Sequence, residues 1–441
     1  MSSSSPTWLR HPLTWVAVLG AALMGALMVS SYIGGLLDPE GHLENAPIGF
    51  VNADTGVTVG TTKLDAGDQV EKQVVASGEG KVDWQVLKTQ EAAERKLRDN
   101  DLWGVIVVPP DFSKDIAGIA TQPTGASSAQ LLILQNEGSG MFQPSVFDKL
   151  SAATVLETNK TVQGQLVGLL AKSHPQLSPA DAAVVGQPVT ATTEAVVSLP
   201  AKSGRGLAPF YLSVMITLTG FLAASIVGIG IDLLRGGERL ELFGRVVDFR
   251  PGGLDTALSP FRLWAAKAVP TVVAAALGGV CAVGTALWIF GMDVSSAWKA
   301  YGLGVLGAVA IALVSLVFLT WFGIAGELLG VLFTTIFGVP AALGIYPYQA
   351  IPGFFQFVSA WHPLRYLVDA MRSVAFFDGS GAGLGRGVTV VAVWLVGALV
   401  VGAVSARLLG GEREPSEVRR GSEVPGDRAP GSAHTEAPGL A

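Results

Sequence analysis

Long apolar tracts alternate with polar segments along the chain, and their lengths separate a membrane part from one large polar block. Residues 13–37 carry no charge over roughly 25 residues, and a helix needs about 20 apolar residues to cross a bilayer. A cleavable signal peptide has a shorter apolar core and a small-residue cleavage site, which Ser30 and Ser31 match poorly. We therefore predict a retained transmembrane anchor over 13–37, preceded by a short N-terminus at 1–12.

Strands and helices alternate within the polar block, residues 38–206. Trp103–Val108 is a short run of mostly β-branched residues that indicates a buried strand, and two prolines end it. Gln90–Arg98 is rich in helix-forming residues. This alternation predicts a small α/β domain. The stretch 173–206 is rich in Pro, Ala, Thr and Ser and predicts a linker back to the membrane.

Five further apolar tracts follow the polar block. The tract 301–345 contains one charged residue, Glu327, and as a single helix it would be about twice as long as the hydrocarbon core is thick. We therefore expect it to fold back near Glu327. The predicted spans after the anchor are 207–234, 268–292, 301–325, 328–345 and 388–408. The predicted fold class is an α-helical integral membrane protein with six transmembrane helices and a small α/β extracytoplasmic domain between the first and second.

The charges on the connecting segments predict the orientation. Arg10 precedes the first apolar tract, and basic residues outnumber acidic ones in 235–267; basic loops face the cytoplasm. We expect a multi-pass plasma-membrane protein with both termini and 235–267 in the cytoplasm and the polar block outside. The tail, 409–441, lacks periodicity and predicts disorder. The outer segment 346–387 has a slight basic excess, so the inverted topology stays open.

The segment 346–387 lies between two apolar tracts but cannot be a plain span. Three prolines interrupt it, and an unsatisfied backbone group in lipid costs several kcal/mol. Arg365 lies four residues before Asp369 and Arg372 three after it, so the three can pair on one helix face. Two interpretations stay open: a surface loop with a short amphipathic helix, or a re-entrant or interfacial functional element. The candidate residues are Pro347, Pro352, Phe354, Phe355, Pro363, Arg365, Tyr366, Asp369 and Arg372.

The composition is typical of a membrane protein and offers little chemistry. Hydrophobic residues make up 50% and charged residues 15% of the chain, against about a quarter charged in soluble domains. The single cysteine, Cys281, rules out an intrachain disulfide. The sequence has no phosphate-binding loop, zinc-ligand cluster or nucleophile elbow. We therefore expect no enzyme activity, cofactor, metal or nucleic-acid partner. The lack of mid-span carboxylates and histidines argues against an ion-driven carrier.

Two stretches resemble the ABC-2-type membrane permease superfamily, in its phage-infection-protein branch. Residues 47–56, Pro-Ile-Gly-Phe-Val-Asn-Ala-Asp-Thr-Gly, resemble the strand and turn that open the external domain of that branch. Residues 346–355 together with 363–372 are similar to its closing segment before the last span. The branch often has Gly-Gly before the proline, where this chain has Gly344 followed by Ile and Tyr. The compact external domain is similar to that of short members, which include fungal nitrosoguanidine-resistance membrane proteins.

The resemblance implies a permease subunit that exports an amphipathic compound, lipid or polymer with a separately encoded ATPase, as in multidrug-resistance relatives. The implied partners are the lipid bilayer, an ABC ATPase and a second copy of the chain. The inner loop 235–267 is long enough to dock an ATPase, with Arg239, Arg245 and Arg250 as candidate contacts. The alternative is a non-transporting accessory or receptor protein, associated with secretion, whose external domain binds a partner.

Overall fold

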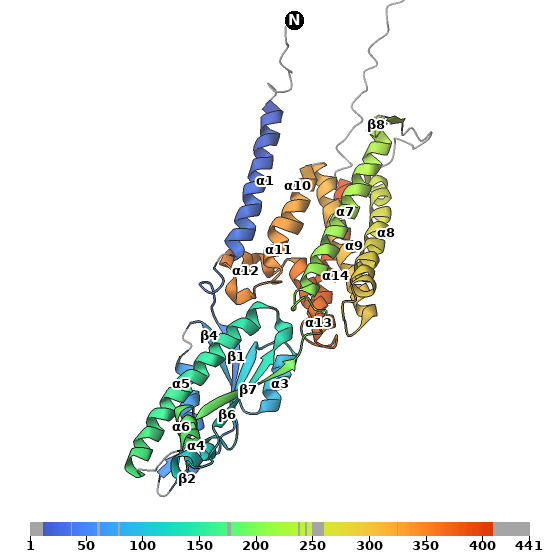
Figure 1. Cartoon of the computed structure of the whole chain (residues 1–441). Coiled ribbons are helices and arrows are strands. Elements are labelled where there is room, and N and C mark those ends of the chain that lie inside the picture. The colour runs from blue at the N-terminus through green and yellow to red at the C-terminus, as the bar shows by residue number, and fades with distance from the viewer. Residues whose placement is uncertain are drawn as a thin grey trace, which may run out of the picture.

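A five-stranded sheet lies at one end of a set of long apolar helices (Figure 1). This arrangement comes from a computed structural model of the chain. The structure describes residues 12–36, 38–59, 62–77, 80–173, 178–236, 239–242, 245–248, 260–323 and 325–408.

The sheet combines parallel and antiparallel neighbours. In spatial order its strands are β4 (Val82–Leu87), β1 (Ala46–Asn52), β5 (Gly104–Val108), β6 (Ala129–Asn136) and β7 (Val189–Val197). Strand β1 runs parallel to both β4 and β5, β5 is antiparallel to β6, and β6 is parallel to β7. A small hairpin of β2 (Val57–Val59) and β3 (Thr62–Leu64) follows β1. The predicted small α/β domain is confirmed.

Helices cover both faces of the sheet, because successive side chains of a strand point to opposite sides. The helices of this domain are α2 (Ala66–Ala76), α3 (Gln90–Arg98), α4 (Phe112–Thr121), α5 (Phe142–Ser173) and α6 (Pro179–Gly186). On β1, Phe50 packs into a core shared with α2, α4 and α5. Its neighbour Val51 packs into a second core with Leu97 of α3. The side chains of Phe50, Val51 and Leu97 are all fully buried.

The prediction of a linker over 173–206 is wrong, because this stretch contains α6 and β7. Helix α6 begins with a capping box in which Ser178 and Asp181 satisfy each other's backbone groups. Strand β7 is an edge strand, and only its ends are buried. Its middle residues therefore need no apolar side chains, so the alternation that marks a half-buried strand is missing.

Apolar helices make up the rest of the described chain. They are α1 (Pro12–Leu36), α7 (Ala208–Gly236), α8 (Pro260–Gly284) with a π-helical continuation η3 (Thr285–Ile289), α9 (Ala297–Phe322), α10 (Ala325–Val331), a π-helical turn η4 (Leu332–Phe337), α11 (Gly338–Ala341) and α14 (Leu384–Leu408). Four stretches are long and apolar enough to cross a membrane: Ala208–Ile231, Phe261–Ile289, Ala297–Phe322 and Leu384–Leu408. Such a chain is a multi-pass membrane protein. The count of six spans stays a prediction, since the apolar stretch Ala325–Ala341 is shorter.

Helix α9 is the centre of this region and packs against α7, α8, α10 and α14. Small buried residues recur on it every four positions, at Ala300, Gly304, Ala308 and Ala312. Small residues let helix backbones approach closely in membranes. On α7, a Cβ added to Gly220 would lie 2.2 Å from the carbonyl oxygen of Ala308. The contact between these two helices therefore requires glycine.

The predicted fold-back near Glu327 is present. Helix α9 ends at Phe322, Gly323 has a positive φ of 58°, and α10 begins at Ala325. A Cβ added to Gly326 would lie 2.3 Å from the carbonyl oxygen of Phe318, so α10 returns directly against α9.

The two ends of the helical region differ. The sheet domain lies at one end, and a hairpin of β8 (Arg239–Leu242) and β9 (Arg245–Asp248) extends from α7 at the other (Figure 1). Helix α8 begins at Pro260, inside the predicted loop 235–267. The predicted N-terminus at 1–12 and tail at 409–441 lie, except for Pro12, outside the described residues. Which end faces the cytoplasm stays a prediction.

Candidate functional site

Residues 346–383, here called the closing segment, connect α11 to α14 through three short helices. These are η5 (Tyr348–Ala350), α12 (Gly353–Ser359) and α13 (Pro363–Phe376). Pro352 occupies the N-cap of α12, and Pro363 is the first residue of α13, where a missing N–H does no harm. The prolines thus divide the segment into helices. Helix α14 begins at Leu384, within the predicted boundaries 346–387.

Side chains on α13 satisfy the carbonyls left free where α12 ends. Arg365 donates from Nη1 to the carbonyl oxygen of Ser359 at 3.3 Å, and the Tyr366 hydroxyl donates to that of Ala360 at 2.6 Å. The last carbonyls of a helix lack intrahelical partners. Two of the predicted site residues therefore hold the α12–α13 corner.

Arg372 likewise satisfies a free backbone carbonyl, in the chain just after α11. It is 5% exposed, and its Nη2 donates to the carbonyl oxygen of Gly344 at 2.7 Å. A buried charge needs partners to offset lost hydration. The expected pair between Asp369 and Arg372 is absent among the described ion pairs, because the guanidinium extends to Gly344 instead.

Arg365 and Asp369 make the expected contact four residues apart, with 3.8 Å between Nε and Oδ2. The pair is largely shielded, since 17% of the Arg365 side chain and 31% of the Asp369 side chain are exposed. The guanidinium of Arg365 also lies over the rings of Tyr348 and Tyr366, 5.6 Å and 5.3 Å from their centroids. This face of α13 is therefore a partly buried polar cluster.

His362 is a buried capping residue that sequence reasoning left unassigned. Its Nδ1 accepts from the backbone N–H of Leu364 at 3.2 Å, and its Nε2 lies 3.0 Å from the carbonyl oxygen of Phe333. These partners require a neutral ring with the proton on Nε2. Burial lowers the pKa of His362 to about 4. The only sequence signal for this role is a histidine directly before the proline that opens α13.

Aromatic rings surround this histidine and extend onto α14. The Phe333 ring centroid is 4.6 Å from that of His362 and 5.4 Å from that of Trp394, and Trp394 donates from Nε1 to the carbonyl oxygen of Trp361. Of the aromatic residues predicted to belong to the site, Phe355 is buried, whereas Phe354 is exposed and contacts the ring of Phe337. Exposed aromatic rings are typical of residues at a membrane interface.

The start of the closing segment joins the sheet domain. The ring of Tyr346 meets that of Phe142 edge to face at 5.1 Å. The backbone N–H of Glu44 donates to the carbonyl oxygen of Gln349 at 3.1 Å. Ala350 is fully buried within the core that contains Phe50 of β1 and the helices beneath it.

Its other end joins both the domain and the helices. A Cβ added to Gly138, just after β6, would lie 3.0 Å from Phe377. The loop after α8 donates twice to the Val374 carbonyl, from the backbone N–H and hydroxyl of Ser295 at 2.9 and 2.7 Å. Lys299 donates to the carbonyl oxygen of Gly379. Helix α13 is therefore buried between the domain and the helices and is not a free surface loop, whereas α12 leaves Phe354 and Phe357 exposed.

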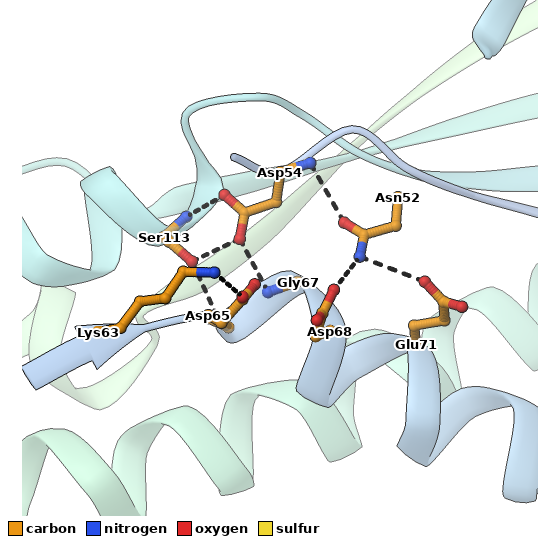
Figure 2. Close-up of polar contacts among 9 residues, drawn as sticks. Asn52, Asp54, Lys63, Asp65, Gly67, Asp68, Glu71 and Ser113 are labelled. Carbon is orange, nitrogen blue, oxygen red and sulfur yellow. Dashed lines mark hydrogen bonds and ion pairs between the residues drawn. The ribbon is translucent and has the colours of Figure 1, made fainter. Parts of the chain in front are cut away.

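The motif at residues 47–56 has a structural role at the end of β1 (Figure 2). The Asp54 carboxylate accepts from the backbone N–H groups of Gly67 and Ser113, both at 3.0 Å. These donors belong to the first turns of α2 and α4, where free N–H groups favour a negative charge. Asn52 Oδ1 accepts a hydrogen bond from the backbone N–H of Asp54. A Cβ added to Gly67 would lie 2.5 Å from this oxygen, so a larger residue does not fit there. The Asp54 carboxylate therefore links the starts of α2 and α4 to the end of β1.

The predicted docking loop is described only in part. Arg239 and Arg245 each open a strand of the β8–β9 hairpin, where Arg239 is opposite Asp248 and Arg245 opposite Leu242. Arg250 lies outside the described residues. The structure therefore brings two of the three arginines onto one hairpin, far from the closing segment (Figure 1).

We predict that stability depends on the neutral His362 ring. Its pKa is about 4 in the fold against about 6.5 when unfolded, so the unfolded chain binds more protons between these values. The melting temperature should fall as the pH decreases from about 6.5 to 4, by a stability loss of up to about 3 kcal/mol. His362→Gln should lower the melting temperature at pH 7.5 and lose most of the decrease between pH 6.5 and 4.5. Identical pH profiles of the two proteins would contradict this assignment.

We also predict that Asp369→Ala lowers the melting temperature in detergent, because it leaves Arg365 shielded and without its carboxylate. Removing one partner costs about 3–5 kcal/mol for a buried pair and about 0–1 for an exposed one, so we expect about 2 kcal/mol here. Adding Arg365→Ala should partly restore the melting temperature. The exposed pair of Lys160 and Glu157 provides the control, since Glu157→Ala should change little. A melting temperature unchanged by Asp369→Ala would show that this contact is unimportant.

Comparisons with known proteins assign the chain to a family. No match to a curated protein was found. Among solved structures, the chain is similar to the crystal structure of a domain of a "putative ABC type-2 transporter" from Thermotoga maritima MSB8, with 18% identity and a TM-score of 0.22 over 34% of this chain and 84% of that one. Residues 17–400, from α1 to α14, match the family described as "Protein of unknown function (DUF3533)". The chain belongs to this family.

Proposed function

We propose that this protein is the membrane permease subunit of an ABC-2-type exporter, which moves an amphipathic compound, lipid or polymer outward with a separately encoded ATPase. The proposal rests first on residues 47–56, 346–355 and 363–372, which resemble the phage-infection-protein branch of that superfamily. The second and third of these stretches both lie within the closing segment, which connects α11 to α14.

One observation carries the proposal: the closing segment is packed against the external domain and the membrane helices at once. Tyr346 and Ala350 belong to the core of the domain, and Leu367 and Met371 of α13 belong to the core around α9. Packed interiors deform little. A displacement of the helices would therefore be transmitted to the external domain, as an exporter that opens outward requires.

The energy source is proposed to be external. The predicted spans contain one acidic residue, Asp232, and Glu327 lies between two of them, where it accepts a hydrogen bond from Ser225 at the α9–α10 turn. Carriers driven by ions keep ionisable groups at membrane depth. The inner loop with Arg239, Arg245 and Arg250 is the proposed ATPase contact, at the end of the helices opposite the domain.

A second candidate function is that of a non-transporting accessory or receptor protein. Edge strand β7 favours it, because its middle residues are exposed and one side of the strand has no neighbour within the sheet. An exposed edge can accept a strand from a partner. In this reading the helices only anchor the domain.

We predict that the purified chain alone does not move a fluorescent single-chain lipid across liposomes under a proton gradient. With the ABC ATPase encoded by a neighbouring reading frame and with ATP, flux should rise at least tenfold. Replacing Arg239, Arg245 and Arg250 by Glu should abolish ATPase co-purification and flux. Reversing the charges of Lys96 and Arg98 on α3 of the external domain is the matched control and should leave both unchanged.

Two results would contradict the proposal. Gradient-driven flux by the chain alone would remove the need for an ATPase. A charge-reversed loop that still binds the ATPase would remove the assigned docking site. A neighbouring secretion cluster without any ABC ATPase would favour the accessory protein.

A further inference from the structure

A half-open cavity of about 400 Å³ lies where α1, the start of α7 and the chain after α11 meet. Each element contributes to the wall: Tyr32 from α1, Val214 from α7, Val339 from α11 and Tyr346 from the closing segment. Small-molecule sites usually have volumes of roughly 300–1,000 Å³. Gly344 keeps this wall closed, because a Cβ added there would lie 1.9 Å from the ring of Phe210.

One wall is built on the π-helical turn η4. Thr335 of this turn lines the cavity, and its carbonyl oxygen accepts from the Tyr32 hydroxyl at 3.3 Å. The next carbonyl, that of Ile336, accepts from the Ser31 hydroxyl. Such π-helical turns are frequent at functional sites. Here the irregular turn holds the anchor helix beside the cavity.

Helix α1 makes a wall that can separate from the others. It approaches the remaining helices only at its C-terminal end, beside α11 (Figure 1). Further toward its N-terminus, Leu19 and Leu23 are exposed. Among the described contacts, the hydroxyls of Ser31 and Tyr32 hydrogen-bond α1 to η4, and the net contribution of a neutral hydrogen bond to stability is modest. A ligand can therefore enter this cavity from the membrane, on the side that α1 borders.

The lining defines the chemistry of the occupant. None of the described residues that line the cavity is charged. An ionised headgroup would therefore be buried without a counter-charge, which is costly. Hydroxyl groups are present on Tyr32, Tyr211, Thr335 and Tyr346, and those of Tyr211 and Tyr346 have no hydrogen-bond partner within the described chain. An uncharged polar head can bond to these groups.

We propose that this cavity binds an uncharged single-chain amphiphile, with its apolar chain between α1 and α7 and its hydroxyl-bearing head at the tyrosines. The occupant enters from the membrane past α1. This inference deepens the proposed function by naming a substrate class, and only its link to export rests on that function.

The test compares radiolabelled 1-monooleoylglycerol with oleate at pH 8, bound to the purified full chain in detergent. Monooleoylglycerol should bind saturably and at least tenfold more tightly than oleate, which has the same chain and a charged head. Val339→Trp should weaken its binding at least tenfold by filling the cavity. Ala276→Trp, in a separate lipid-facing groove of α8, α9 and α14, is the matched control and should leave binding within twofold of wild type.

Tyr346→Phe provides a second variant, which removes a hydroxyl that has no partner within the described chain and leaves the ring. It should weaken monooleoylglycerol binding several-fold without lowering the melting temperature, even if Val339→Trp fails to fold. Equal affinities for the two probes, or wild-type affinity in Tyr346→Phe, would overturn the proposal. Because binding is measured without an ATPase, this outcome is separate from the fate of the exporter. ATPase-dependent flux that survives complete loss of binding would overturn only the link between this cavity and export.

Discussion

Backbone carbonyls that helix breaks leave without partners are the constraint on which this structure depends. A plain span satisfies its own backbone, whereas a segment with three prolines does not, and a buried carbonyl that lacks a partner is costly. The chain meets this demand with side-chain donors: Arg365 and Tyr366 at the end of α12, and Arg372 after α11. His362 does the same for the carbonyl oxygen of Phe333 in the π-helical turn η4, through its Nε2. These four residues fix where the short helices lie, and the domain and helices pack around them.

This view explains why charged residues occur in a segment between two apolar tracts. Arg372 is almost fully buried and has no carboxylate within ion-pair distance among the described residues, so its main role is that of a donor to Gly344. Arginine suits such a role because it stays protonated and presents several N–H groups. Asp369 offsets part of the positive charge through Arg365. Helix α13, which carries these residues, also joins the sheet domain to α9 through its apolar side chains.

Much of the architecture follows from the sequence, for identifiable reasons. The long uncharged tracts predict the helices well, because bilayer thickness sets their length, and the excess length of 301–345 predicts the turn at Gly323. The contact between Arg365 and Asp369 follows from helical spacing. Strand β7 was missed because an edge strand with exposed middle residues has no apolar alternation. The roles of His362 and Arg372 depend on carbonyls of Phe333 and Gly344, which lie 29 and 28 positions away along the chain; local patterns cannot reveal such pairings.

The central claim is that helix α13 of the closing segment is buried between the sheet domain and the membrane helices. Hydrogen-exchange mass spectrometry of the full chain in lipid nanodiscs tests it most directly, because amide protection over minutes to hours reports local opening. The account predicts that amides of α13 exchange as slowly as those of the buried part of α9. Exchange of α13 as fast as that of the exposed loop between α4 and β6 would contradict it.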